Sequence, residues 1–371
     1  MTKGILVLRD YLLAEQVTLV VMEATGDYWR PFYYLLDPAL NVMLVNARHA
    51  KNMPGRKTVS DAQWLAELGA HGLVRPSFVP PEDIRQLGDL TRSRTIFVAE
   101  KTREIQRVEK LLEDANIKLS SVATRTLGVS GRAMIEALIA GEQDPEALAA
   151  LARGRLKNKN DQLVRALDGR FNDHHAFTAR MHLDHIDALE HGITGLSERV
   201  DAVIGPLAPC NDLLVTIPGV SKTVAEIIIA ETGADMTQFP TAAHLASWAG
   251  VCPGHNESAG KRKSSHARPG NTHLKGALGI AAMAAVRTNG TYLQARYKRL
   301  TSRRGPMRAL VAIEHTMIIA MWHMFTNGTV FEDLGSDHFQ RTHHKHAKRK
   351  AIKQLHQLGY EVQLAPLTAA S

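Results

Sequence analysis

A short segment around Ser258 combines a hydroxyl group with small residues and many cations. It reads Glu-Ser-Ala-Gly-Lys-Arg-Lys over residues 257–263. A serine that attacks a phosphate needs open backbone for close approach and positive charge for the transition state. Ala259 and Gly260 clear space here, and the charge comes from Lys261, Arg262, Lys263 and Arg268. The pattern indicates a nucleophilic serine, although Ser264, Ser265 or a basic loop without chemistry would fit the same local description.

Two carboxylates in the first part of the chain could hold a metal ion. Glu23 closes the apolar run Val17–Met22, and Asp61 lies where a later helix begins. Carboxylate oxygens are the ligands that Mg²⁺ prefers, so Glu23 and Asp61 are candidate metal ligands and catalytic residues. Read locally, Asp61 could equally be the N-cap of its helix.

The elements around these carboxylates alternate between strand and helix. We predict a strand at 17–22, a helix at 29–36, a strand at 42–45 and a helix from 61 to about 68. This order is typical of a parallel α/β sheet, in which ligands bind at the strand ends.

Two long amphipathic helices are predicted next. The first covers about 91–119, with apolar residues such as Ile105 and Val108 at helical spacing. The second carries an apolar seam at steps of three and four residues, namely Ile186, Leu189, Ile193, Leu196, Val200 and Val203. Such a seam is typical of a coiled coil, and either a hairpin within the chain or a dimer contact could bury it.

A helical region is predicted after Pro206 and Pro209. Its opening, residues 216–223, is a Pro-Gly turn followed by a helix start capped by Ser221 or a neighbour. Free N–H groups at such a start suit a phosphate, which makes Gly219 and Lys222 candidate nucleic-acid contacts. A tight turn that only reverses the chain is the alternative. Further helices are predicted at 277–286 and 309–325, followed by a basic, His-rich run at 341–350.

Charge is concentrated in one segment. The chain has a formal net charge of +8 and a pI near 9.5, and residues 255–308 hold twelve Lys or Arg, Lys275 among them, against the single acid Glu257. The rest of the chain is nearly balanced. A polyanionic partner such as nucleic acid fits this distribution, because binding to phosphates releases counterions.

Several classes of protein are disfavoured by composition. Cys210 and Cys252 are too few for a disulfide framework, and we expect both to be buried as small apolar residues. We see no membrane span, secretory signal or Walker-type loop in the sequence, so we expect a cytoplasmic protein that needs no nucleotide cofactor.

Several motifs occur together in one order along nearly the whole chain. They are Met-Glu-Ala-Thr-Gly at 22–26, the stretch from Asn46 to Thr58, Ser-Asp-Ala at 60–62, Ile-Pro-Gly-Val at 217–220, Ala-Ser-Trp-Ala-Gly at 246–250 and Glu-Ser-Ala-Gly at 257–260. Together they resemble the IS110 family of insertion-sequence transposases, which are relatives of the Piv invertase.

The resemblance implies an α/β plus all-α chain of several domains. Expected are a RuvC-like, RNase H-like domain with an Asp-Glu-Asp-Asp site at 1–90, a coiled-coil linker at 91–205, a mainly helical transposase domain at 210–330 and a basic tail at 331–371. It also implies that Ser258 links covalently to DNA, that Glu23 and Asp61 bind Mg²⁺, and that a structured guide RNA bridges donor and target DNA. Two DNA partners would require a homo-oligomer, either a dimer or a tetramer.

The sequence departs from the family pattern in two places. No strand carrying Gly-Ile-Asp precedes the first helix, and the Lys-Thr-Asp motif is replaced by Lys57-Thr58-Val59. Two of four carboxylate ligands are therefore missing, which predicts weak metal binding and a truncated or decayed copy with little transposition activity.

Three hypotheses follow from the sequence. The first is a DNA recombinase that uses Ser258, and the second is a catalytically inactive DNA- or RNA-binding remnant of such an enzyme. The third, a helical repair or junction-binding protein, rests on the turn at 217–220 alone and leaves Glu23, Asp61 and Ser258 unexplained.

Overall fold

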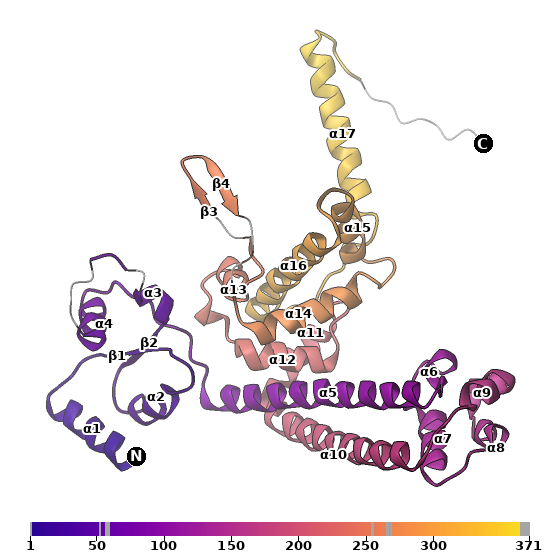
Figure 1. Ribbon diagram of the computed structural model, residues 1–371. Coiled ribbons are helices and arrows are strands. Elements are labelled where there is room, and N and C mark those ends of the chain that lie inside the picture. Colours follow the sequence, from indigo (N-terminus) through magenta and orange to yellow (C-terminus); the bar gives the residue numbers. More distant parts are fainter. Residues whose placement is uncertain are drawn as a thin grey trace. The chain divides into compact units, whose positions relative to one another are not determined.

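The computed structural model describes residues 2–51, 53–55, 60–253, 256–264, 267 and 269–363. The chain is mostly helical and forms two compact units, residues 1–81 and 82–371, which are described separately (Figure 1).

The N-terminal unit places a two-stranded parallel sheet among helices. Its elements are α1 (Thr2–Ala14), β1 (Val20–Glu23), α2 (Arg30–Leu36), β2 (Val42–Val45), α3 (Ala47–Lys51) and α4 (Asp61–Ala70). The pairing runs from Val20 opposite Val42 to Glu23 opposite Val45. The predicted strand was wrong by three residues at its start, because the Val17 amide instead closes the end of α1 by donating to the Leu12 carbonyl.

Alternation along the strands divides this unit into three layers. Val20, Met22 and Val42 pack in a cluster with residues of α1 and α2. Val21, Met43 and Val45 point to the other face and pack with α4. Figure 1 shows the strands between α2 and α4. The predicted alternation of strands and helices is confirmed, and Glu23 ends the strand at the sheet's carboxyl edge.

Two long helices, α5 (Glu82–Asp114) and α10 (Asp173–Ile204), form an antiparallel hairpin in the second unit (Figure 1). Lys101 pairs with Glu190 near the middle of the two helices, and Asp114 pairs with His175 where α5 ends and α10 begins. The apolar seam of α10 therefore packs on α5 of the same chain, as the hairpin alternative predicted.

The limits of α5 differ from the prediction. It begins at Glu82, directly after Pro81, and its first turn carries the acids Glu82 and Asp83. It ends at Asp114, where Asn116 adopts a φ of 59° and the Ile117 amide donates to the Leu112 carbonyl. The sequence pattern stayed apolar to Leu119, but the left-handed residue ends the helix earlier.

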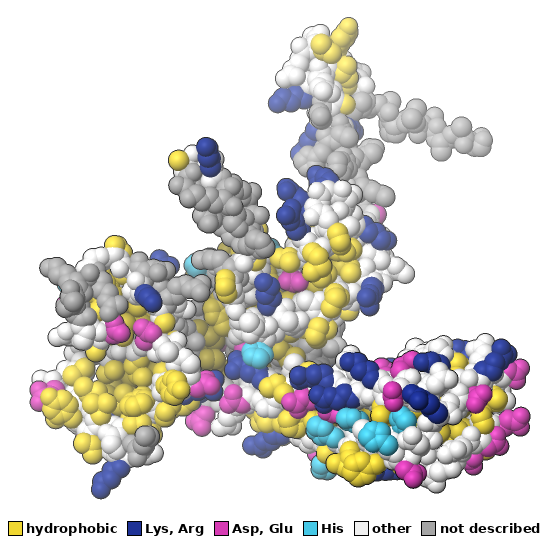
Figure 2. All heavy atoms as spheres, viewed as in Figure 1, with side chains coloured by type: hydrophobic (Ala, Val, Ile, Leu, Met, Phe, Trp, Pro, Cys, Tyr) yellow, Lys and Arg dark blue, Asp and Glu magenta, His cyan; other side chains and the backbone are white. Residues whose placement is uncertain are grey.

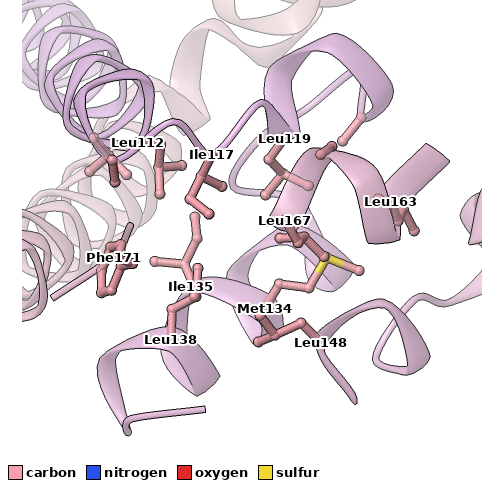
Figure 3. Close-up of a cluster of buried hydrophobic side chains, with 14 of the residues drawn as sticks. Leu112, Ile117, Leu119, Met134, Ile135, Leu138, Leu148, Leu163, Leu167 and Phe171 are labelled. Carbon is pink, nitrogen blue, oxygen red and sulfur yellow. The ribbon is translucent and has the colours of Figure 1, made fainter. Parts of the chain in front are cut away.

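A small helical module closes the far end of this hairpin. This tip module, residues 115–171, contains α6 (Leu119–Val122), α7 (Val129–Ile139), α8 (Pro145–Ala150), the 3₁₀ helix η1 (Gly154–Lys159) and α9 (Asn160–Leu167). Figure 3 shows its buried core, in which Ile135 of α7, Leu148 of α8 and Leu167 of α9 meet. No sequence pattern predicted this module.

The remainder of the second unit is a helical bundle with one β-hairpin. Its elements are η2 (Gly205–Leu207), α11 (Ala208–Val215), α12 (Lys222–Thr232), η3 (Met236–Gln238), α13 (Ala242–Trp248), β3 (Asn256–Ser258), β4 (Lys261–Ser264), α14 (Thr272–Ala285), α15 (Tyr292–Arg304), α16 (Pro306–Asn327) and α17 (His338–Gln357). The predicted helices at 277–286 and 309–325 are confirmed as parts of α14 and α16, and the basic run at 341–350 lies on α17.

This region also contains the apolar helix α16 and both cysteines of the chain. Helix α16 is long and apolar enough to cross a membrane, but Ile313, Met317 and Met321 are buried against neighbouring helices, as in the core of a bundle. Cys210 and Cys252 are half-buried rather than buried, so that expectation was wrong. Burial still raises the pKa of the Cys210 thiol.

Candidate functional site

Ser258 lies at the tip of a two-stranded hairpin. Strand β3 ends at Ser258, β4 begins at Lys261, and these two residues pair directly across the antiparallel ladder. Only Ala259 and Gly260 connect them, with φ values of 50° and 75°. Two positive φ values in a two-residue loop define a type I′ turn. We call residues 256–264 the serine hairpin.

The turn is exposed and its first residue is strained. Ala259, Gly260 and Lys261 are exposed to solvent. A left-handed conformation suits Gly260 but costs Ala259 on the order of 1 kcal/mol, because its Cβ crowds the following carbonyl. Strained residues of this kind are concentrated at functional sites. The residue next to Ser258 therefore holds a conformation that local sequence preference opposes.

The serine hairpin is anchored where it joins the bundle. Gly270 packs against the backbone of Ala249 and Gly250 so closely that a Cβ would overlap it. The Asn271 amide donates to the Trp248 carbonyl at 3.3 Å. The two ends of the segment that carries Ser258 are thus held together by backbone contact.

A buried acid, Glu231, holds Asn271, the residue that follows Gly270 at the base of the serine hairpin. Glu231 on α12 is 2% exposed; its Oε2 accepts from Asn271 Nδ2 at 2.6 Å, and Arg92 of α5 donates to both its oxygens at 2.8 and 2.7 Å. Asn271 Oδ1 in turn accepts from the amides of His273 and Leu274, which caps α14. This Arg92–Glu231–Asn271 network links α5, α12 and α14. Sequence reasoning missed it, because its three residues lie far apart in the chain.

A second buried ion pair joins α5 to α12. Arg94 Nη2 donates to Glu226 Oε2 at 2.5 Å, and both side chains are buried. Lys222 lies within 3.9 Å of the other Glu226 oxygen, and its Nζ contacts Asp201 at 2.6 Å. The hydrogen bond to Asp201 raises the pKa of Lys222. Lys222, predicted as a nucleic-acid contact, is therefore paired within the protein, and that role stays a prediction.

The Pro-Gly turn before α12 is shaped by packing. Ser221 caps the helix by accepting from the Val224 amide at 3.3 Å, which confirms the predicted cap. Gly219 has a φ of 89°, and a Cβ there would lie 2.9 Å from Ala285 Cα of α14. A close approach to α14 thus accounts for the glycine, which neither the phosphate contact nor the chain-reversal alternative predicted. Binding of phosphate by Gly219 stays a prediction.

The other predicted cations are distributed over the serine hairpin and α14. Arg262 and Lys263 lie on β4, but their side chains and all of Arg268 fall outside the described residues. Lys275, in the first turns of α14, is half-buried and interacts electrostatically with Glu314 of α16. Burial raises the pKa of Glu314, although the charge of Lys275 opposes this, and its Oε2 has no hydrogen-bond partner among the residues that the structure describes.

The two candidate metal ligands occupy different kinds of position. Glu23 ends β1, is half-buried and accepts from Thr25 Oγ1 at 2.5 Å. Asp61 is exposed in the first turn of α4. The N-cap alternative for Asp61 was wrong, because Ser60 caps α4 in a reciprocal capping box with Gln63. Asp61 is thus not needed for the cap.

The described part of the chain lacks a full set of side-chain ligands for a metal ion. No group of three or more His, Cys, Asp or Glu side chains in that part of the chain lies close enough to hold an ion. The described carboxylates therefore do not make up a complete metal centre by themselves.

Comparison with known proteins identifies the family. A family model described as "Transposase IS116/IS110/IS902 family" matches residues 211–298, and a second, a DEDD-type transposase model of the IS110 family, matches residues 3–117. An uncharacterized 43.6 kDa protein of insertion element IS110 from Streptomyces coelicolor is 34% identical over 129 residues. This chain belongs to the IS110 family of transposases. The aligned part covers 33% of this chain and 31% of the relative's length.

Proposed function

We propose that this protein is a DNA transposase that cuts and rejoins strands through a covalent link to Ser258. The observation that carries the proposal is the exposed I′ turn at the tip of the serine hairpin, where Ser258 pairs with Lys261. Ala259, Gly260 and Lys261 of the turn are exposed, which suits contact with a polymer, whereas the side chain of Ser258 falls outside the described residues. We propose that the basic strand β4 supplies charge for an anionic transition state.

The covalent step is an exchange of one phosphoester for another. The Ser258 oxygen forms a bond to phosphorus as the bond to a deoxyribose oxygen breaks; the serine gives up its proton, and the leaving oxygen takes one up. Attack on this ester by a hydroxyl of another strand forms the new phosphodiester and frees the serine. Because each step replaces one ester with another, no nucleotide cofactor is required.

The N-terminal unit would contribute carboxylates. We propose that it is a RuvC-like, RNase H-like domain in which Glu23 and Asp61 are ligands of Mg²⁺. A bound divalent ion would polarise a phosphate oxygen. Such an ion would assist the serine chemistry by orienting the DNA strand, and Glu23 and Asp61 alone do not complete its site.

The partners follow from the family and the charge. We propose DNA as substrate, bound by Lys261, Arg262, Lys263, Arg268 and Lys275 together with the turn at Gly219 and Lys222. A structured guide RNA, assembly as a dimer or tetramer and a cytoplasmic location belong to the same proposal. So does the division into segments 1–90, 91–205, 210–330 and 331–371.

A covalent-adduct assay tests the proposal. Labelled DNA that carries the element's end is incubated with the full chain, denatured and separated by gel electrophoresis. We expect an adduct that Ser258→Ala abolishes and that Ser264→Ala, a hydroxyl on the facing strand of the same hairpin, retains. An adduct unchanged in Ser258→Ala would defeat the assignment of the nucleophile.

One observation favours a second function. Because the described residues contain no cluster of metal ligands, a non-catalytic nucleic-acid-binding remnant is the alternative. It predicts binding to DNA or RNA with no adduct from either the parent chain or Ser264→Ala. A serine-dependent adduct would exclude this alternative.

A further inference from the structure

The tip module contains an open cavity of about 670 Å³ that is lined by cations. Two loops form it: residues 122–131, which lead from α6 into α7, and residues 153–159, which form η1. The cations on its wall are Arg125, Arg153, Arg155 and Lys159, and no acidic residue lines it. Figure 2 shows Lys, Arg, Asp and Glu mixed on the visible face of the α5–α10 hairpin and the tip module, so a wall of one sign differs from its surroundings.

No described acidic side chain neutralises these cations. None of the four forms a salt bridge within the described part of the chain, whereas Arg132, a few residues away on α7, pairs with both Glu136 and Asp187. Lys159 only donates to the Val122 carbonyl, at 3.0 Å. Four like charges around one cavity repel each other, and an anionic ligand would relieve that repulsion.

The cavity has a built frame. Gly131 passes so close to the Thr126 carbonyl that a Cβ would overlap it, and the Arg153 amide donates to Ser130 Oγ at 2.8 Å. The first turn of α7 also lines the cavity, and no side chain caps it at Gly128. Beneath lies the core drawn in Figure 3. The two loops are thus held in place before any ligand binds.

The lining chemistry indicates which anion would bind. The four cations on these two loops carry more positive charge than a single phosphate group would neutralise. Val122, Val129 and Leu156 also line the cavity, and their apolar side chains suit sugar rings. Among the described residues, the lining includes no aromatic side chain on which a base could stack and no Asn or Gln that could pair with adenine, so most of its polar groups are cations suited to phosphates. A polymer of phosphates held by its backbone fits best, with little dependence on sequence.

We propose that this cavity binds the phosphodiester backbone of a nucleic acid. It lies apart from the serine hairpin, because α5 contacts α12 at Arg94 and continues for twenty residues to Asp114, roughly 30 Å of helix. The α5–α10 hairpin would then carry a second contact for a strand, separate from the chemistry at Ser258.

Binding of labelled oligonucleotides to the full chain tests this site. The variant Arg153→Ala/Arg155→Ala removes two charges from the cavity wall, and we expect about tenfold weaker binding and a salt dependence reduced by about two ions. The matched control is Lys157→Ala, which removes an exposed charge from the same 3₁₀ helix outside the cavity; we expect less than about a twofold change. All three side chains are exposed, so the fold should be retained, and circular dichroism checks this.

The arms of the experiment use DNA and RNA of the same sequence, and an acidic polypeptide as a third probe. Weaker binding of either nucleic acid supports the proposal and identifies the strand. If the double variant binds both nucleic acids as Lys157→Ala does, or loses only the acidic polypeptide, the proposal is wrong. Because the readout is binding, it can fail while the Ser258 adduct forms, and the reverse.

Discussion

The two regions that carry the candidate catalytic residues differ in whether they bury charged side chains. Among its described residues the N-terminal unit buries no charged side chain, and Glu23 and Asp61 lie in half-buried or exposed positions. In the described part of the second unit five are buried, namely Arg94, Glu104, Glu226, Glu231 and Glu314. A buried charge is costly unless partners fix it, so this unit depends on exact pairing.

This difference shows two ways of positioning a reactive group. Glu23 is positioned by the end of a strand whose two faces are packed by apolar layers. Ser258 lies on a hairpin of two short strands, which would be marginal alone. Its position depends on Gly270 and on the Arg92–Glu231–Asn271 network at its base. The contrast predicts that polar substitutions matter more in the second unit.

The largest effect is expected at Glu231. Replacing it by Ala leaves Arg92 and Asn271 without their buried partner, which should lower the free energy of unfolding by about 3–5 kcal/mol. Urea denaturation measures this. The control is Glu190→Ala, which breaks an exposed pair with Lys101 and should cost at most about 1 kcal/mol. If Glu231→Ala and Glu190→Ala lowered the free energy of unfolding equally, the buried network would not be more important for stability than an exposed ion pair.

Two tightly packed glycines compare the regions directly. A Cβ at Gly270 would strike backbone, which cannot yield, and Gly270→Ala should cost about 2–4 kcal/mol. A Cβ at Gly69 of α4 would strike the Val21 side chain, which can shift, and alanine gains about 1 kcal/mol of helix propensity. Gly69→Ala should therefore cost less. Thermal unfolding of both variants measures the two costs, and a larger loss of stability in Gly69→Ala than in Gly270→Ala would contradict this prediction.

Two buried acids should respond to pH in opposite directions. Burial raises the pKa of Glu314 above its ordinary 4.5, so its charge destabilises the folded state once pH rises through the unfolded value. Glu314→Gln should therefore stabilise the protein at neutral pH, on the order of 1 kcal/mol, with no gain well below pH 4.5.

Glu104 is the matched control for that experiment. Burial would raise its pKa, but a hydrogen bond from His182 and the charge of Arg107 outweigh burial and hold the pKa below 4.5. Its stabilising contribution is present above pH 4.5 and is lost as pH falls through the lowered folded value. Glu104→Gln should thus destabilise at neutral pH. Equal signs for the two variants in unfolding at pH 7 would contradict this assignment.

The smallest effect is expected at the cap of α4. Ser60→Ala removes the side-chain acceptor for the Gln63 amide and should cost about 1 kcal/mol in the N-terminal unit. Asp61→Asn leaves that cap intact and should change stability by only a few tenths of a kcal/mol. If Asp61 is a metal ligand, its variant should instead reduce strand exchange. A stability loss at Asp61 as large as that at Ser60 would indicate a structural role.

Local sequence determined much of this protein. The apolar runs that became β1 and β2, the Ser221 cap and the helices α2, α4, α14 and α16 were all predictable from periodicity and capping. Neighbouring residues decide these features, because propensity and spacing act over a few positions. The predicted start of β1 and the predicted limits of α5 were wrong, because hydrogen bonds in the neighbouring turns decide where these elements begin and end.

Tertiary structure alone decided how the candidate sites are supported. Arg92, Glu231 and Asn271 meet across three helices, and the cavity of the tip module joins loops from residues 122–131 and 153–159. The apolar seam of α10 was visible in the sequence, but its partner α5 was not. Contacts between residues distant in the chain depend on which apolar faces pack together. A single sequence shows that a helix has an apolar face, but it does not show which other element that face packs against.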